Sequence, residues 1–213
     1  MALLPKQAAK SCLRRARRFL ELAENDSPVI RCMNDLRRMA LVMSVAAVDA
    51  YLHGIVLRRL ADVRRRVDLP KALAQLEIPF AELAALADTS IVARRTNRRT
   101  RPWVQVKAAL QKRLLRETFQ SYDQVGAAFA TAGVAKAWPR VATAIGEDAK
   151  VIKNRLNGLV HRRNQIVHEG DMKRASRPRR LRFNDVQHSR VRVDIDWVES
   201  LIDAMDTVVT SEP

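Results

Sequence analysis

The stretch from Met39 to Leu57 is almost continuously apolar, and it constrains the fold more than any other feature. A helix over this stretch is about long enough to cross a bilayer. However, Asp49 and His53 lie in its middle, and ionisable side chains are costly inside lipid. Arginine pairs flank it at 37–38 and 58–59, so the charges favour neither orientation across a membrane. We therefore expect no membrane span, but a helix buried on all sides at the centre of a bundle.

Apolar residues recur at three- and four-residue steps along most of the chain, which predicts an all-α fold. Aromatic residues make up only 5% of the sequence, and this suits packed helices better than a β-sandwich. The length fits one domain over residues 1–213. We expect core helices over about 6–24, 29–66, 103–122, 146–169 and 195–209. Between them we expect short helices over 69–88 and 123–143, and an extended piece over 191–193 followed by Asp194 or Asp196 as a helix cap.

The chain carries 39 Lys and Arg residues against 23 Asp and Glu, a net charge of +16. A polyanion is the natural partner of such a chain; the alternative is an ordinary arginine-rich surface, and charge does not separate RNA from DNA. Two segments without an apolar face concentrate the charge, so we expect basic loops over 94–102 and 172–182. The residues expected to bind RNA are Arg94, Arg95, Arg98, Arg99, Arg101, Lys173, Arg174, Arg177, Arg179 and Arg180.

The sequence contains only two cysteines, Cys12 and Cys32, and no Cys/His cluster with the spacing of a zinc site. We therefore expect no disulfide, no metal and no cofactor. The N-terminus lacks the long apolar segment of a secretory signal, and we expect a cytoplasmic location. Neither a glycine-rich phosphate loop nor a Ser/His/Asp arrangement favours another class of enzyme.

On a helical wheel that starts at Leu156, Arg163 lies at the centre of an apolar stripe, at about −20°. The apolar members of the stripe fall within about 80° of Leu156; they are Leu159, Val160, Ile166 and Val167. Burying a guanidinium without an anion is very costly. The position of Arg163 therefore calls for a carboxylate, a phosphate or a subunit interface.

A polar stripe lies beside the apolar one and consists of Asn157, His161, Asn164 and His168. Asn164 and His168 are four residues apart, so they are neighbours on a helix. The end of this helix thus offers a guanidinium for developing charge, an imidazole for proton transfer and an amide that fixes geometry. These groups suit a scissile phosphate. Structural roles are the alternative: His168 could complement the helix dipole, and Asn164 could cap backbone groups.

The segment RLNGLVHRRNQIVHEGD, residues 155–171, resembles the signature of the HEPN superfamily. It is most similar to the bacterial RiboL-PSP-HEPN-like group, in which an R-R/H-x-x-[IV]-V-H-x-G-D pattern closes a bundle helix. The close similarity covers residues 152–171, and a looser similarity covers Met43 to Leu57. The resemblance implies an HEPN-like up-down helical bundle with extra short helices.

The same resemblance implies roles for individual residues. Arg163, Asn164 and His168 occupy the catalytic positions of the motif, with His161 and Arg162 as supporting residues. HEPN proteins often carry an acidic residue on the central helix that faces the motif, and Asp49 matches it. A structural ion pair between Arg163 and Asp49 is the alternative.

The activity implied is metal-independent endoribonuclease cleavage, which leaves a 2′,3′-cyclic phosphate and a 5′-hydroxyl. A histidine imidazole, with an ordinary pKa of about 6.5, suits both proton removal and proton donation. The family also implies a homodimer with a composite active site, a role as a toxin or anti-phage defence effector, and an antitoxin or defence-system partner. The alternative is a non-catalytic HEPN module that binds nucleotide or nucleic acid, or that partners a nucleotidyltransferase or another effector. A purely structural helical scaffold is a third reading.

Overall fold

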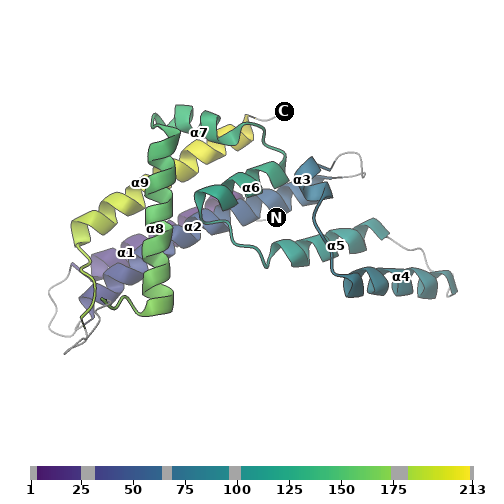
Figure 1. The fold of residues 1–213 in the computed structure, drawn as a ribbon, viewed down its shortest axis with the longest axis horizontal. Coiled ribbons are helices and arrows are strands. Elements are labelled where there is room, and N and C mark those ends of the chain that lie inside the picture. Colours follow the sequence, from purple (N-terminus) through teal and green to yellow (C-terminus); the bar gives the residue numbers. More distant parts are fainter. Residues whose placement is uncertain (1–3, 25–31, 64–68, 96–101, 174–181, 212–213) are drawn as a thin grey trace.

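The fold is all-α in a computed structural model that describes residues 4–24, 32–63, 69–95, 102–173 and 182–211. Across these residues there are nine helices and no strand, apart from an isolated bridge between Met172 and Phe183 (Figure 1). The helices are α1 (Pro5–Leu22), α2 (Met33–Asp62), α3 (Lys71–Ala74), α4 (Phe80–Arg95), α5 (Pro102–Leu114), α6 (Tyr122–Ala132), α7 (Ala137–Ile145), α8 (Ala149–Glu169) and α9 (His188–Thr210).

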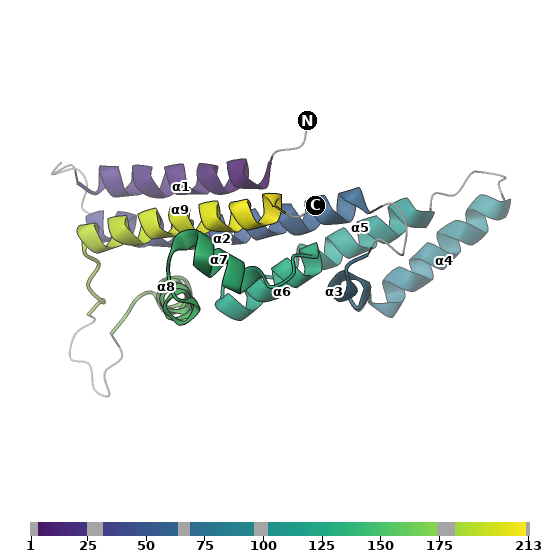
Figure 2. The same ribbon diagram turned by 90° about the horizontal axis from the view of Figure 1, so that it is seen from above.

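Helix α2 is the centre of the bundle. It contacts α1, α5, α6, α8 and α9, and it runs alongside α1 and α9 (Figure 2). Helices α6, α7 and α8 lie on the opposite side of this layer from α1 (Figure 2). Helix α8 crosses the layer steeply, so one end of it projects past the edge of the bundle (Figure 1).

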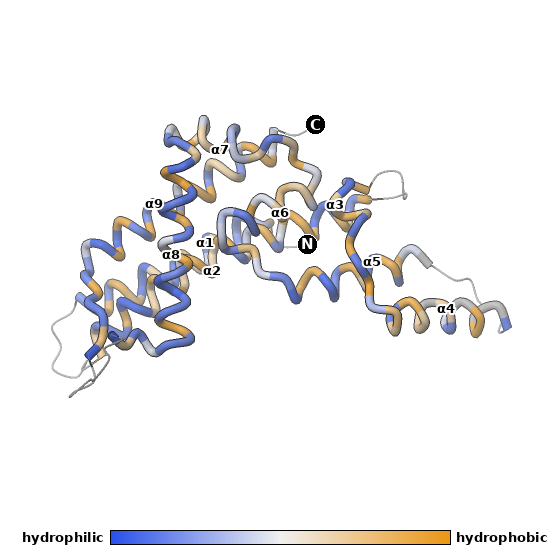
Figure 3. Tube along the Cα trace, viewed as in Figure 1, coloured by the Kyte–Doolittle hydropathy of each residue, from blue (hydrophilic) through white to orange (hydrophobic). Residues whose placement is uncertain are grey.

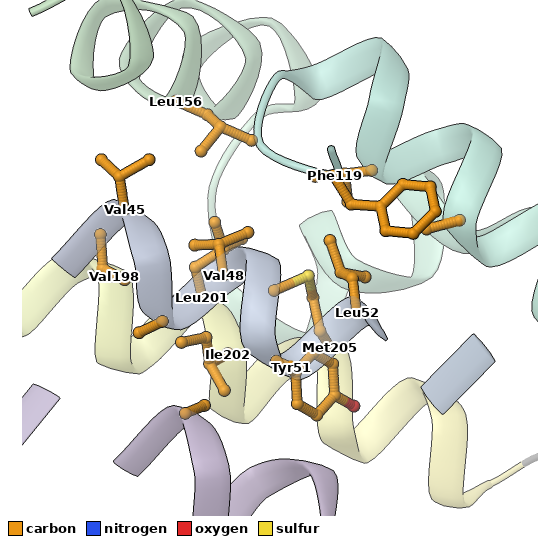
Figure 4. Packing of buried hydrophobic residues seen from close by; sticks show 14 of the residues in the cluster. Val45, Val48, Tyr51, Leu52, Phe119, Leu156, Val198, Leu201, Ile202 and Met205 are labelled. Carbon is orange, nitrogen blue, oxygen red and sulfur yellow. The ribbon is translucent and has the colours of Figure 1, made fainter. Parts of the chain in front are cut away.

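The core forms where α2 and α9 face each other, because both helices bury apolar residues along much of their length. Figure 4 shows the centre of this packing, and Figure 3 shows the apolar stripes that it joins. The labelled side chains are Val45, Val48, Tyr51, Leu52, Phe119, Leu156, Val198, Leu201, Ile202 and Met205. Tyr51 keeps its hydroxyl satisfied by donating to Asp206 at 3.3 Å, as buried polar groups must.

Within the described chain, α2 is also the one helix long and apolar enough to cross a bilayer. However, 56% of its apolar window is buried inside the bundle. The apolar length of α2 is therefore accounted for by its central position.

Helix α1 approaches α2 closely at Gly54, where there is no side chain. A Cβ placed on Gly54 would lie 2.7 Å from Cβ of Pro5 and 2.9 Å from its Cα. Contacts this short do not occur in folded proteins, so Gly54 sets the distance between the start of α1 and α2.

Several expected boundaries are wrong, including the end expected at residue 88, since α4 continues to Arg95. The helix expected over 103–122 ends at Leu114, and a new helix, α6, starts at Tyr122 after Ser121, whose side chain caps it by accepting from the Gln124 N–H at 3.4 Å. The extended piece expected over 191–193 lies inside α9, which begins at His188. Asp194 and Asp196 are consequently not caps; both lie within that helix, and Asp194 is buried.

Candidate active site at the end of helix α8

Helix α8 carries the whole motif and has well-defined ends. Asp148 caps its start by accepting from the Lys150 N–H at 2.7 Å. Gly170, with a left-handed φ of 60°, ends it, and the N–H of Asp171 donates back to the carbonyl of Gln165 at 3.0 Å. This ending suits glycine, which adopts the left-handed conformation without steric cost.

The three expected catalytic residues lie on the last two turns of α8 and are accessible. Asn164 and His168 are exposed, and Arg163 is half-buried. The guanidinium of Arg163 donates to Oδ1 of Asn164 at 2.9 Å, so these two groups are held together. His168 follows Asn164 by one helical turn on the same face. A phosphate could therefore approach all three side chains from solvent.

The apolar stripe of α8 extends beyond the core that covers its first half. Ile152 and Leu156 are fully buried and Leu159 is 6% exposed, whereas Val167 is 46% exposed. Arg163 lies on this later, half-open part of the stripe. The helical wheel therefore identifies the correct face of α8, but one chain alone does not fully bury Arg163.

Asp49 does not pair with Arg163. Its carboxylate accepts from the backbone N–H of Phe119 at 2.6 Å and lies 3.8 Å from Nε2 of His53. His53 Nε2 is itself 3.1 Å from the carbonyl oxygen of Glu117. Asp49 thus holds the segment between α5 and α6, and the alternative of an ion pair between Asp49 and Arg163 is wrong.

The two supporting residues differ. His161 is exposed on the outer face of α8. The guanidinium of Arg162 instead bonds both carboxylate oxygens of Asp171, with Nη2 2.9 Å from Oδ2, and it also contacts the carbonyl of Asp185 at 3.3 Å. Arg162 therefore positions the helix end rather than facing solvent.

Asp171 is the centre of a buried charged cluster that sequence reasoning missed; we call it the Asp171 cluster, formed by Asp171 with Arg38, Arg162 and Asn184. Its carboxylate is in contact with Arg38 Nε at 2.5 Å and Asn184 Nδ2 at 3.1 Å. The residue is 1% exposed and has a left-handed φ of 58°. The cluster ties α8 to α2 and to the chain that leads into α9.

The charge of Asp171 is stabilised by its partners. Burial acts to raise the pKa of Asp171, but hydrogen bonds from Arg38, Arg162 and Asn184 outweigh it and bring the pKa below the ordinary value. Asp171 is therefore an anion between two arginines at neutral pH. Two residues in the sequence pointed to this cluster. Asp171 ends the HEGD segment, and Arg38 belongs to the arginine pair that flanks the long apolar stretch.

The two ends of the basic segment after α8 are joined through the backbone. Lys173 donates its backbone N–H to the carbonyl of Arg182 at 2.7 Å, next to the bridge between Met172 and Phe183. The side chain of Lys173 is exposed. Four other expected RNA-binding residues, Arg174, Arg177, Arg179 and Arg180, lie outside the described residues.

The other expected basic loop, 94–102, is partly helical. Helix α4 continues through Arg94 to Arg95, and Pro102 begins α5. The side chain of Arg95 is exposed. The remaining expected residues there, Arg98, Arg99 and Arg101, lie outside the described residues.

In the part of the chain that the structure describes, no group of three or more His, Cys, Asp or Glu side chains could hold a metal ion.

A family model described as RiboL-PSP-HEPN matches residues 12–211, almost the whole chain. No curated protein and no solved structure matches it. The matched range contains the end of α8 and all four members of the Asp171 cluster.

Proposed function

The chain belongs to the RiboL-PSP-HEPN family of the HEPN superfamily, and from this premise we propose that it is a metal-independent endoribonuclease. The single observation that carries the proposal is the accessible trio of Arg163, Asn164 and His168 on the last two turns of α8. These side chains stand on a helix end that the buried Asp171 cluster fixes. A rigid base with reactive groups open to solvent is what a catalytic site on a helix requires.

The reaction proposed is attack of an RNA 2′-hydroxyl on the neighbouring phosphorus. The bond from phosphorus to O2′ forms and the bond to O5′ breaks, which leaves a 2′,3′-cyclic phosphate and a 5′-hydroxyl. The proton of the 2′-hydroxyl passes to an imidazole, and O5′ takes up a proton from an acid. His168 supplies the imidazole, and Arg163 stabilises the negative charge that develops on the phosphate oxygens.

Two protomers would complete the site. One His168 cannot hold the proton and donate another in the same step, whereas a pair of chains offers two imidazoles. The open part of the α8 stripe, with Val167 46% exposed beside half-buried Arg163, supports an interface there. We therefore propose a homodimer in which the ends of two α8 helices face each other.

The net charge of +16 supports RNA as the substrate, because the phosphate backbone dominates affinity for basic proteins. We further propose that the enzyme acts in the cytoplasm as a toxin or anti-phage effector and that an antitoxin or defence-system protein restrains it. Induced expression of the wild type should then arrest cell growth, and the His168→Ala variant should not. Equal growth of the two strains would contradict this role.

The direct test is cleavage of labelled RNA by the purified full chain in EDTA. Wild type should release fragments with 2′,3′-cyclic phosphate ends, and His168→Ala should lose about 10²- to 10⁴-fold in rate. His188→Ala is the control, since His188 begins α9, pairs with Glu24 at 3.2 Å and should keep its rate. Equal RNA decay with wild type and His168→Ala would overturn the proposal.

One observation favours the alternative of a non-catalytic RNA-binding module. The amide of Asn164 bonds Arg163, and no described residue hydrogen-bonds the ring of His168 to set its tautomer. Such a module predicts RNA affinity that survives His168→Ala, with no cleavage at any pH. The same assay therefore separates the two functions.

A further inference from the structure

A groove of about 360 Å³ runs between α8 and the start of α9, beside the apolar stripe of α8, which Leu159 borders. We call it the Asp194 groove. Its wall includes Arg155, Gly158, Leu159, Arg162, Val191 and Asp194. The volume matches a small-ligand site rather than a packing defect.

Asp194 is the unusual member of this wall. It is 4% exposed, and its Oδ1 is buried without a hydrogen bond. The two nearest guanidiniums are too far to donate, with Arg155 Nη2 3.8 Å from Oδ1 and Arg190 Nε 3.6 Å from Oδ2. Burial raises the pKa of Asp194, although both arginines act to lower it. A buried carboxylate in this state gains from a ligand that brings N–H donors.

Arg155 is held away from Asp194 by other contacts. Its guanidinium lies over the ring of Trp197, 4.6 Å from the centroid, and donates to the carbonyl of Val193 at 3.3 Å. Arg162 is likewise held by Asp171. The arginines around the groove therefore leave the buried carboxylate without a hydrogen bond and add positive charge, which disfavours a cationic ligand and favours a phosphate.

The chemistry of the groove selects among RNA bases. Leu159 and Val191 offer an apolar wall for a planar ring, and Asp194 offers only acceptors when ionised. Guanine presents two adjacent N–H donors on its Watson–Crick edge, at N1 and N2. Adenine and cytosine place an acceptor beside the amino group, and uracil flanks its single N–H with two carbonyls.

We propose that the Asp194 groove binds a guanine base of the RNA substrate, with Asp194 accepting from its N1–H and N2–H and the exposed Arg190 contacting a flanking phosphate. This inference rests on the proposed ribonuclease function and adds its base preference. Gly158 lines the groove and His168 follows it by about 15 Å along α8. A few nucleotides lying on the outer face of α8 span that distance.

The test measures binding apart from cleavage, with the full chain carrying His168→Ala. Fluorescence anisotropy would compare labelled oligouridines that contain one central guanosine, inosine, adenosine or no substitution. Guanosine should bind about tenfold more tightly than the others. Inosine, which lacks the N2 amino group, should lose most of that advantage. Equal affinities for guanosine and adenosine oligomers would overturn the inference.

Two variants locate the effect. Asp194→Asn should remove the guanosine preference, while Asp196→Asn, the matched change at an exposed position on the same helix, should keep it. Gly158→Leu should block the groove, and Gly158→Ala should not, because a Cβ there meets nothing within 4 Å. Circular dichroism would establish that each variant is folded. A preference unchanged in Asp194→Asn would also overturn the inference.

Failure of the proposed function gives a different result. If wild type does not cleave RNA but the guanosine preference depends on Asp194, the groove is a base-binding site on a non-catalytic module. If wild type cleaves RNA without any preference for guanosine, the ribonuclease function stands and the assignment of the groove fails.

Discussion

The carboxylate of Asp171 binds the guanidinium of Arg162 through both of its oxygens, so the residue next to Arg163 is tied to the chain beyond α8. Arg38 bonds the same carboxylate from α2. The end of α8 is thus fixed by buried charges, while Asn164 and His168 are exposed and Arg163 is half-buried. This division separates residues that position the site from residues that would touch RNA.

Asp171→Asn should destabilise the fold by about 3–5 kcal/mol, because it leaves two arginines without their buried anion. Asparagine tolerates the left-handed φ at this position, so the charge is the main change. Urea unfolding would measure the loss. Asp35→Asn is the control, since it removes the exposed partner of Arg38 and should have a much smaller effect. Similar losses in both variants would contradict the central role of Asp171.

The acid stability of the protein should depend on Asp171. Its pKa in the folded state lies below the ordinary value of 3.8. Its stabilising contribution is therefore complete above that value and is lost as the pH falls through the lower, folded-state pKa. The difference in unfolding free energy between wild type and Asp171→Asn should be constant near neutral pH and shrink in acid. A difference that stays constant below the ordinary pKa would count against this account.

Arg163→Ala should lower kcat by about 10²- to 10³-fold, because the arginine stabilises charge that develops in the transition state. Its half-buried side chain makes no ion pair among the described residues, so stability should change by less than about 0.5 kcal/mol. Single-turnover cleavage and thermal unfolding would measure the two effects. A large loss of stability would instead indicate a structural role for Arg163.

Val167→Asp should weaken the proposed dimer and reduce cleavage together, because it puts a charge into the open apolar stripe. Val151→Asp is the matched control: Val151 is 52% exposed at the other end of α8. Sedimentation velocity over a concentration series would report the assembly state. Dimers that persist in Val167→Asp would place the interface elsewhere.

Gly54→Ala should destabilise the fold by about 1–3 kcal/mol through overpacking against Pro5. Alanine favours a helix over glycine by about 1 kcal/mol, so the substitution would stabilise the fold if α1 did not lie so close. The sign of the change in unfolding free energy therefore tests this close approach. Gly158→Ala, in open space on α8, should be stabilising. Thermal unfolding of both variants would distinguish the positions, and a stabilising Gly54→Ala would show that α1 yields easily.

The sequence predicts the helices well where their burial is strongly patterned. The continuous apolar run predicts α2, and the spacing from Ile152 to Leu159 predicts the buried half of α8. The start of α9 is misread because Val191 and Val193 alternate like a strand, although only Val191 is buried. A wheel also cannot show where the core stops, so it does not reveal that Arg163 lies beyond it.

The partners of the site residues are harder to predict, because they come from distant parts of the chain. Arg38 and Asp171 are 133 residues apart, and no local pattern joins them. As an aspartate, Asp194 is expected to cap a helix, but its burial depends on how α9 packs beside α8. The motif thus predicts which side chains form the candidate site. The tertiary packing determines which of them are fixed by contacts with other residues and which are exposed.

The β-bridge between Met172 and Phe183 separates the basic segment after α8 from the helix itself. The backbone hydrogen bond from Lys173 to Arg182 joins the two ends of the intervening segment right after α8. Insertions, deletions or substitutions within that segment therefore need not disturb α8. Substitutions in that segment should therefore alter the proposed RNA contacts without altering the proposed reaction at the end of α8.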